Sequence, residues 1–157
     1  MFNNRSLQNK KILIYGFGIS GKSCFNYLKK NNDVEIFDDN ETLKNKKNRV
    51  FFPGATKVRK KIYDYIVISP GINIENCKLK KYLKKNINKL ITEFDIFYLT
   101  FPKNIKITIT GTNGKSSTCH MLFKIFRSIR ADVRLVGNIG NPPLKEKKIS
   151  PQTIFII

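Results

Sequence analysis

Two glycine-rich segments of this sequence have the residue types and spacing needed to bind phosphate. The first spans residues 16–21 (GFGISG), between a short apolar run and a helical pattern. Glycines at this spacing allow a tight turn and a close backbone approach to a diphosphate, and the following helix N-terminus offers unpaired N–H groups. Asp38, at the end of the next expected strand, stands where an acid meets a ribose hydroxyl in a dinucleotide site.

These residues alone predict a nucleotide site, and NAD satisfies it as well as any other ligand. A nicotinamide-dependent dehydrogenase is therefore one open alternative. A glycine turn that only packs a helix against a strand is another, because short glycine motifs also occur without a ligand.

The second segment spans residues 111–116 (GTNGKS) and ends in Gly-Lys-Ser, the chemical core of a phosphate loop. In such a loop backbone N–H groups wrap the phosphate oxygens, Lys115 reaches the terminal phosphates and the Ser116 hydroxyl binds magnesium. Ile109 occupies the position where the general Walker pattern has its first glycine. The segment therefore predicts a shortened loop for a nucleoside triphosphate.

The elements around both segments alternate between strand and helix. We expect strands over 11–15, 34–37, 65–68, 90–91, 105–109, 133–136 and 153–157, and helices over 23–30, 79–85, 93–99 and after residue 116. In the last helix the expected apolar stripe is Met121, Leu122, Ile125, Phe126 and Ile129. In the 79–85 helix, Leu79, Tyr82 and Leu83 share one face.

This alternation predicts an α/β fold with parallel sheets. A Rossmann-like parallel-sheet domain over residues 1–102 is followed by the start of a P-loop-type α/β domain over residues 103–157, with the boundary at Pro102. The apolar run at 153–157 has the character of a buried central strand, which needs neighbours on both edges. We therefore expect the sequence to stop inside its second domain.

The charge of the chain is strongly positive, with 30 Lys and Arg against 11 Asp and Glu, a formal net charge of +19. The lysines are interleaved with Asn and Ile along the whole chain, so we expect a solvated basic surface and no nucleic-acid partner. A basic nucleic-acid-binding module stays open as the alternative.

Cys24, Cys77 and Cys119 are odd in number and widely spaced, which predicts reduced thiols. No apolar run has membrane-spanning length and residues 1–10 are polar. We expect a cytoplasmic protein without a membrane partner.

Several motifs together resemble one family. Residues 110–116 (TGTNGKS) resemble the shortened ATP loop of the Mur ligase family, the ATP-dependent amide-forming enzymes of peptidoglycan precursor synthesis. Residues 16–24 (GFGISGKSC), 68–72 (ISPGI) and 137–140 (GNIG) resemble successive landmarks of its D-glutamate-adding members. The resemblance runs from about Lys10 to the end of the chain.

The resemblance implies that the first domain binds the UDP part of UDP-N-acetylmuramoyl-L-alanine. Ile19 and Ser20 would contact the uracil and diphosphate region, and Asp38 and Asp39 would lie near the uracil. The full implied set for this substrate is Gly18, Ile19, Ser20, Asp38, Asp39, Ser69, Pro70, Gly71 and Asn138.

For the second domain the resemblance implies ATP and Mg²⁺ as cofactors. The implied ATP-binding residues are Gly111, Thr112, Asn113, Gly114, Lys115, Ser116 and Ser117. Lys115 would be the catalytic residue and Ser116 a magnesium ligand. The substrate carboxylate would attack the γ-phosphate to give an acyl phosphate, from which the amine of D-glutamate would displace phosphate to form the amide.

In the family, further metal ligands and the D-glutamate-binding domain follow the strand that corresponds to 153–157. We therefore expect these 157 residues alone to bind the UDP substrate, to hold ATP weakly and to leave the reaction incomplete. We expect a monomer, and we expect His120 to be a helix-surface residue without a metal.

Overall fold

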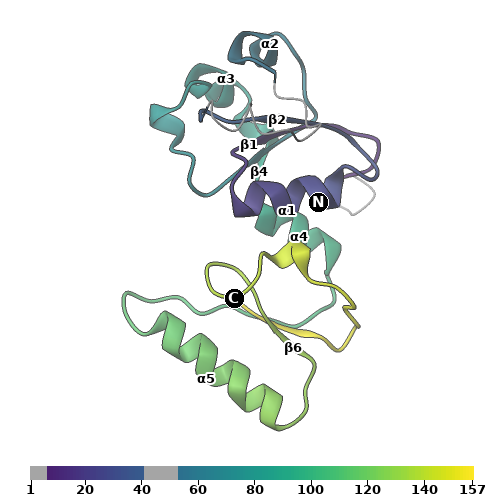
Figure 1. The fold of residues 1–157 in the computed structure, drawn as a ribbon, viewed down its shortest axis with the longest axis vertical. Helices are drawn as coiled ribbons and strands as arrows, with labels where there is room; N and C mark the ends of the chain where they lie inside the picture. Colours follow the sequence, from purple (N-terminus) through teal and green to yellow (C-terminus); the bar gives the residue numbers. More distant parts are fainter. Residues whose placement is uncertain (1–6, 41–52) are drawn as a thin grey trace. The chain divides into compact units, whose positions relative to one another are not determined.

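The computed structural model describes residues 7–40 and 53–157. The chain divides into two compact units, Met1–Leu99 and Thr100–Ile157 (Figure 1), and each is described by itself. This division lies within the last helix of the first unit, a few residues before the expected boundary at Pro102.

The first unit is built on a parallel sheet with the order β2-β1-β3-β4. Its strands are β1 (Lys11–Tyr15), β2 (Asp33–Phe37), β3 (Tyr65–Ile68) and β4 (Leu90–Ile91). β1 lies between β2 and β3, and its residues from Ile12 onward are buried. A strand covered on both faces requires the unbroken apolar run that the sequence shows there. The parallel α/β architecture is confirmed.

The helices of the first unit connect these strands. They are α1 (Ile19–Leu28), α2 (Ala55–Arg59), α3 (Lys80–Lys85) and α4 (Glu93–Thr100). Short 3-10 helices lie at Ile74–Asn76 and Ile87–Lys89. Helix α1 begins four residues before the expected start at Ser23, because Gly18 takes the extended N-cap conformation and the first turn falls inside the glycine motif. The sequence pattern missed α2, a mostly polar turn in which Val58 is the buried residue.

One core cluster of the first unit forms between one face of the sheet and the segments after β2. Its buried members are Leu13, Tyr15, Phe37, Val58, Tyr63, Ile66, Leu79 and Leu83, and Tyr82 packs against them. The expected inner face of the 79–85 helix is therefore confirmed. Glu35 is also buried, with its carboxylate accepting hydrogen bonds from the side chains of Lys61 and Tyr63.

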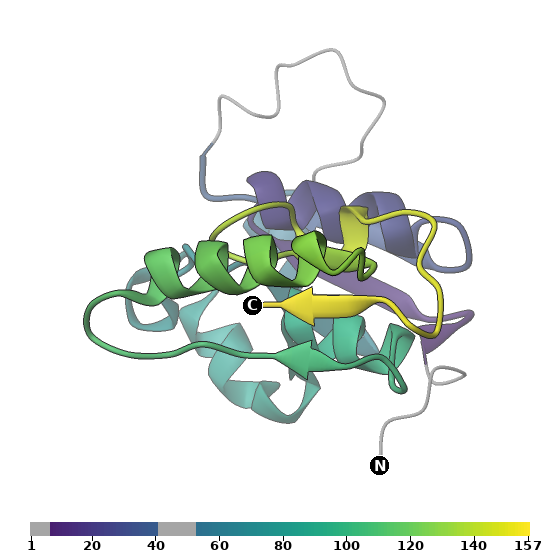
Figure 2. The ribbon, with the colours of Figure 1, turned by 90° about the horizontal axis from the view of Figure 1, so that it is seen from below.

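The second unit contains a smaller parallel sheet with the order β5-β7-β6. Its elements are β5 (Lys106–Ile107), α5 (Lys115–Ser128), β6 (Val133–Leu135), a 3-10 helix (Pro143–Lys145) and β7 (Ile154–Ile156). Strand β7 lies in the middle, as its apolar sequence predicted. Helix α5 packs against β6 and β7 (Figure 2).

The expected apolar stripe of α5 is wrong in part. Cys119 is buried, and Leu122, Phe123 and Phe126 pack around it against the sheet. Met121, Ile125 and Ile129, which follow one another every four residues, are exposed. The helix carries two adjacent rows of apolar residues, and the sequence pattern does not distinguish them. The three-stranded sheet contacts only one of these rows.

The cysteines carry no disulfide bond: Cys24 and Cys119 are buried, Cys77 is half-buried, and all three are free. Within the described part of the chain, no helix combines the length and apolar character that crossing a lipid bilayer requires.

Candidate functional site

The ends of β1 and β3 form the first candidate site. The loop after β1 begins at Gly16 and the loop after β3 begins at Ser69, and the two touch. The Ser69 backbone N–H donates to the Tyr15 carbonyl at 3.0 Å, and its hydroxyl donates to the Gly16 carbonyl at 2.9 Å. In this strand order the connections from β1 and β2 leave in opposite directions, and ligands of α/β sheets bind at such a switch point.

The three glycines of the first loop have different roles. Gly16 has φ +95°, and a Cβ there would lie 2.8 Å from the Ser69 Cβ. A Cβ on Gly21 would lie 1.9 Å from the Gly16 carbonyl oxygen, so this glycine lets α1 approach the loop. A Cβ on Gly18 would meet no atom within 4 Å among the described residues. Gly16 and Gly21 therefore serve the fold, and Gly18 faces open space.

The N-terminus of α1 lies beside this open space. Gly18 is its N-cap, and no side chain caps the first turn within the described residues. Uncapped N–H groups and the helix dipole favour an anion there. Ile19, at the first helical position, is 78% exposed and offers an apolar surface next to these amides. Ser20 is half-buried and donates a hydrogen bond to Glu93.

The two aspartates after β2 are both engaged inside the unit. Asp38 accepts the Phe17 N–H at 2.6 Å and the Asn40 N–H at 2.8 Å, one on each carboxylate oxygen. Asp38 therefore shapes the glycine loop, a role the sequence did not reveal. Asp39 accepts the Tyr15 hydroxyl at 2.7 Å through Oδ2, while its buried Oδ1 has no partner among the described residues.

The loop after β3 places Ser69, Pro70 and Gly71 differently. The Ser69 side chain is buried, and its hydroxyl donates a hydrogen bond to the Gly16 carbonyl. Pro70 and Gly71 are exposed, and a Cβ on Gly71 would meet nothing within 4 Å in the described structure. These two residues therefore present the accessible surface of this loop.

The second candidate site is the loop between β5 and α5. Residues 110–118 are exposed. Gly111 and Gly114 have φ of +150° and +78°, and Gly114 is the N-cap of α5, again without a side-chain cap. The loop therefore turns open amides and a helix N-terminus outward, which suits a polyphosphate.

Lys115 lies folded over this loop. Its Nζ donates to the Gly111 carbonyl and, at 3.2 Å, to the Thr112 carbonyl. The ammonium group therefore already lies at the mouth of the loop. Ser116 and Ser117 are exposed in the first turn of α5, and no described group of three His, Cys, Asp or Glu side chains is placed to hold a metal.

Asn138 lies in a tight turn after β6. Gly137 and Gly140 have φ of +109° and +86°, and a Cβ on Gly140 would lie 2.1 Å from the Leu135 carbonyl oxygen. The Asn141 N–H closes the turn by donating to that carbonyl at 3.2 Å. Asn138 is exposed between these glycines.

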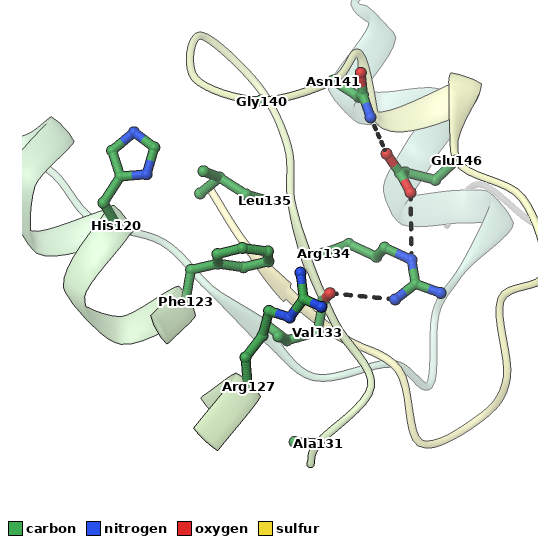
Figure 3. A pocket seen from close by; sticks show the side chains of 10 residues that line it. All are labelled: His120, Phe123, Arg127, Ala131, Val133, Arg134, Leu135, Gly140, Asn141 and Glu146. Carbon is green, nitrogen blue, oxygen red and sulfur yellow. Dashed lines mark hydrogen bonds and ion pairs between the residues drawn. The ribbon is translucent and has the colours of Figure 1, made fainter. Parts of the chain in front are cut away.

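A pocket of about 510 Å³ lies in the second unit beside α5 (Figure 3). Sequence reasoning missed it. Its lining residues are His120, Phe123, Arg127, Ala131, Val133, Arg134, Leu135, Gly140, Asn141 and Glu146. Arg134 contacts Glu146, which accepts from Asn141 at 2.7 Å, so this side of the pocket is charge-balanced. His120 is exposed at the rim, as expected for a helix-surface residue.

Comparison with known proteins gives these sites their context. Residues 10–90 match the family described as Mur ligase MurD-like, N-terminal domain. The chain is 34% identical over 136 residues to a UDP-N-acetylmuramoylalanine--D-glutamate ligase of Oenococcus oeni, covering 86% of this chain and 30% of that protein. The enzyme of the same name from Rickettsia prowazekii is 34% identical over 145 residues, covering 89% and 32%.

The chain thus spans about a third of the length of these curated relatives. Among solved structures, UDP-N-acetylmuramate:L-alanyl-gamma-D-glutamyl-meso-diaminopimelate ligase from Neisseria meningitidis matches with a TM-score of 0.54 and 14% identity, over 94% of this chain and 52% of that chain. That likeness supports the fold alone. The family match includes the first glycine loop, β2 and the loop after β3, so the resemblance seen in the motifs is confirmed: this chain belongs to the MurD-like family of Mur ligases.

Proposed function

We propose that the chain carries the UDP-substrate unit and the ATP phosphate loop of a ligase that adds D-glutamate to UDP-N-acetylmuramoyl-L-alanine in peptidoglycan precursor synthesis. The family match over residues 10–90 carries the proposal, because it contains the open glycine loop at the switch point of the first sheet. The names of the relatives supply the substrate pair.

In the first unit, the proposed ligand is the uridine diphosphate group. The open side of Gly18 and the uncapped first turn of α1 suit the diphosphate. The buried Oδ1 of Asp39 is an acceptor without a partner among the described residues, and the N3–H of uracil would reach it once the side chain turned outward. Ile19, Pro70 and Gly71 add exposed surface for the nucleoside.

In the second unit, residues 111–117 would hold the phosphates of ATP. Lys115 would exchange the two loop carbonyls for phosphate oxygens, a short movement for a long side chain whose ammonium already lies at the loop. Ser116 would hold Mg²⁺, which when bound neutralises phosphate charge. Positioning and charge neutralisation are the main contributions of a protein to phosphoryl transfer.

In the proposed reaction the substrate carboxylate takes the γ-phosphoryl group of ATP, and the D-glutamate amine then displaces phosphate. The part of the first unit is to orient the UDP substrate, and the part of the second unit is to fix the triphosphate with Lys115. A cytoplasmic location and a monomeric state remain predictions from the sequence.

Binding tests the proposal most directly, because the chain covers about a third of its relatives. Calorimetric titration with UDP-N-acetylmuramoyl-L-alanine is expected to show binding at least tenfold tighter than NADH. Gly18→Val, which places a side chain in the open space, is expected to weaken it at least tenfold. Gly54→Val is the matched control, because Gly54 is also an N-cap with negative φ and no atom near a built Cβ among the described residues.

Lys115→Ala is expected to leave the UDP compound bound as before and to weaken ATP. Equal affinity for NADH and the UDP compound, or unchanged binding in Gly18→Val, would contradict the proposal.

A further inference from the structure

Glu93 is a buried carboxylate that the proposed function leaves unexplained. It is the first residue of α4 and is 7% exposed. Its Oε2 accepts the Ser20 hydroxyl at 2.5 Å, and its buried Oε1 has no hydrogen-bond partner among the described residues. A buried charge with a single donor is costly and calls for a reason.

Two helix ends lower the cost of this buried charge. Glu93 belongs to the first turn of α4, where Thr92 and Asp95 form a reciprocal cap: the Thr92 N–H donates to Asp95 at 2.7 Å and the Asp95 N–H donates to the Thr92 hydroxyl at 3.3 Å. Ser20 belongs to the first turn of α1. The partial positive charge at each helix N-terminus favours a carboxylate nearby.

The thiol of Cys24 lies in the same cluster. Burial, followed by the charge of Glu93, raises the pKa of this thiol and outweighs the nearby Ser20 hydroxyl, which acts to lower it. The thiol therefore stays protonated and neutral. The Ser20 hydroxyl remains the one side-chain donor to Glu93 in the described structure.

We infer that Glu93 is a positioning residue that holds the proton of Ser20, so that Ser20 meets the bound UDP substrate as a hydrogen-bond acceptor. This rests on the proposed function of the first unit. A serine hydroxyl has one proton and two lone pairs. With the proton directed to Glu93, only lone pairs remain for a ligand.

The ligand group that meets Ser20 is then an O–H or N–H donor of the nucleoside or sugar. Phosphoryl oxygens, which need donors, are left to the backbone amides of α1. Turning the hydroxyl toward a phosphate would remove the single hydrogen bond of a buried carboxylate, a penalty larger than the gain from one exposed contact.

The test compares the affinities of uridine and UDP, measured by calorimetry on the whole chain. Ser20→Ala is expected to change the ratio of the two dissociation constants by less than twofold, because the Ser20 hydroxyl does not contact the phosphates and the backbone amide is kept. Glu93→Leu frees the Ser20 proton and is expected to favour UDP over uridine by an additional three- to tenfold. Glu93→Gln keeps an acceptor oxygen and is expected to retain the wild-type ratio.

Each contrary outcome identifies a different error. A selective loss of UDP affinity in Ser20→Ala refutes the inference, and it needs no variant at Glu93. If Glu93→Gln and Glu93→Leu had the same ratio of uridine and UDP dissociation constants, the Glu93 charge would act on the ligand directly and not through the Ser20 hydroxyl. The same conclusion would follow if Glu93→Leu changed this ratio equally in the Ser20→Ala background. Failure of the wild-type chain to bind either probe refutes the proposed function itself.

Discussion

Adding one methyl group at Gly21 is expected to destabilise the first unit strongly, whereas the same change at Gly18 is not. A Cβ on Gly21 would lie 1.9 Å from the Gly16 carbonyl oxygen and 2.9 Å from the Gly16 carbonyl carbon, both of them backbone atoms. Contact distances in proteins are rarely below about 3 Å, so α1 must move by about 1 Å away from the loop. Overpacking of this kind costs about 3 kcal/mol, the upper end of the usual range.

Thermal unfolding followed by circular dichroism measures this cost. For a domain of about 100 residues, 1 kcal/mol corresponds to about 4–8 °C in Tm, so Gly21→Ala is expected to lower the Tm by more than about 10 °C. Gly18→Ala is the matched control in the same loop. Gly18 has φ −71° and open space at the Cβ position, so its Tm should stay within about 2 °C of the wild type.

The two variants also separate folding from binding. Gly18→Ala is expected to weaken the binding of UDP although it leaves the Tm unchanged, because the added methyl group narrows the approach to the α1 amides. A Gly21→Ala protein that melts within 2 °C of the wild type would refute the assignment of the third glycine to helix–strand packing. The partition of the motif into structural and ligand-facing glycines would then fail.

Three further predictions concern other contacts. Burial acts to raise the pKa of Glu35, but hydrogen bonds from Lys61 and Tyr63 and the charge of Lys61 outweigh it and hold that pKa below its usual 4.5. A carboxyl pKa lowered by folding contributes stability above its unfolded value and loses it as pH falls through the folded one. The Tm of the wild type should therefore drop below about pH 4.5 more steeply than that of Glu35→Gln. Tyr15→Phe removes the shorter of the two hydrogen bonds that Asp39 Oδ2 accepts and should lower the free energy of unfolding in urea by about 1–3 kcal/mol. A loss below about 0.5 kcal/mol would contradict the importance of this bond. Lys115→Ala removes an exposed side chain and should leave the Tm within about 2 °C while weakening ATP, measured by calorimetry, at least tenfold; a lower Tm with unchanged ATP affinity would make Lys115 a structural residue.

The parallel architecture was predictable because strands that are buried on both faces of a sheet consist of nearly unbroken apolar runs. The segments 11–15 and 65–68 are such runs, and the structure has strands with these bounds. The start of α1 was not predictable from apolar spacing, because the apolar residue of its first turn, Ile19, is exposed and the turn also contains Ser20 and Gly21. Two apolar rows on α5 were merged for a similar reason: the sequence shows which residues are apolar but not how wide a sheet the helix contacts.

The candidate site shows a sharper limit. Both glycine loops could be identified from residue types, because phosphate binding requires particular residues close together in the sequence. The hydrogen-bond partners of these side chains could not be predicted from the sequence, because they come from distant segments. Ser20 and Glu93 are 73 positions apart, and Gly16 and Ser69 are 53 positions apart. No local pattern links such pairs. The structure is needed to tell a side chain that is free for a ligand from one that is already engaged.

This distinction explains why the first glycine motif alone does not identify its ligand. Two of its three glycines are required by the contact between the glycine loop, α1 and the loop after β3. Any nucleotide-binding sheet of this type must make such a contact. Gly18 is the glycine of the motif with open space at its Cβ position among the described residues, and such an opening would suit any diphosphate. The selectivity must come from the end of β2, where an acid with a free carboxylate would favour a ribose diol. Here each carboxylate oxygen of Asp38 already accepts a backbone N–H, and Asp39 accepts the Tyr15 hydroxyl, so both acids at the end of β2 are engaged within the first unit.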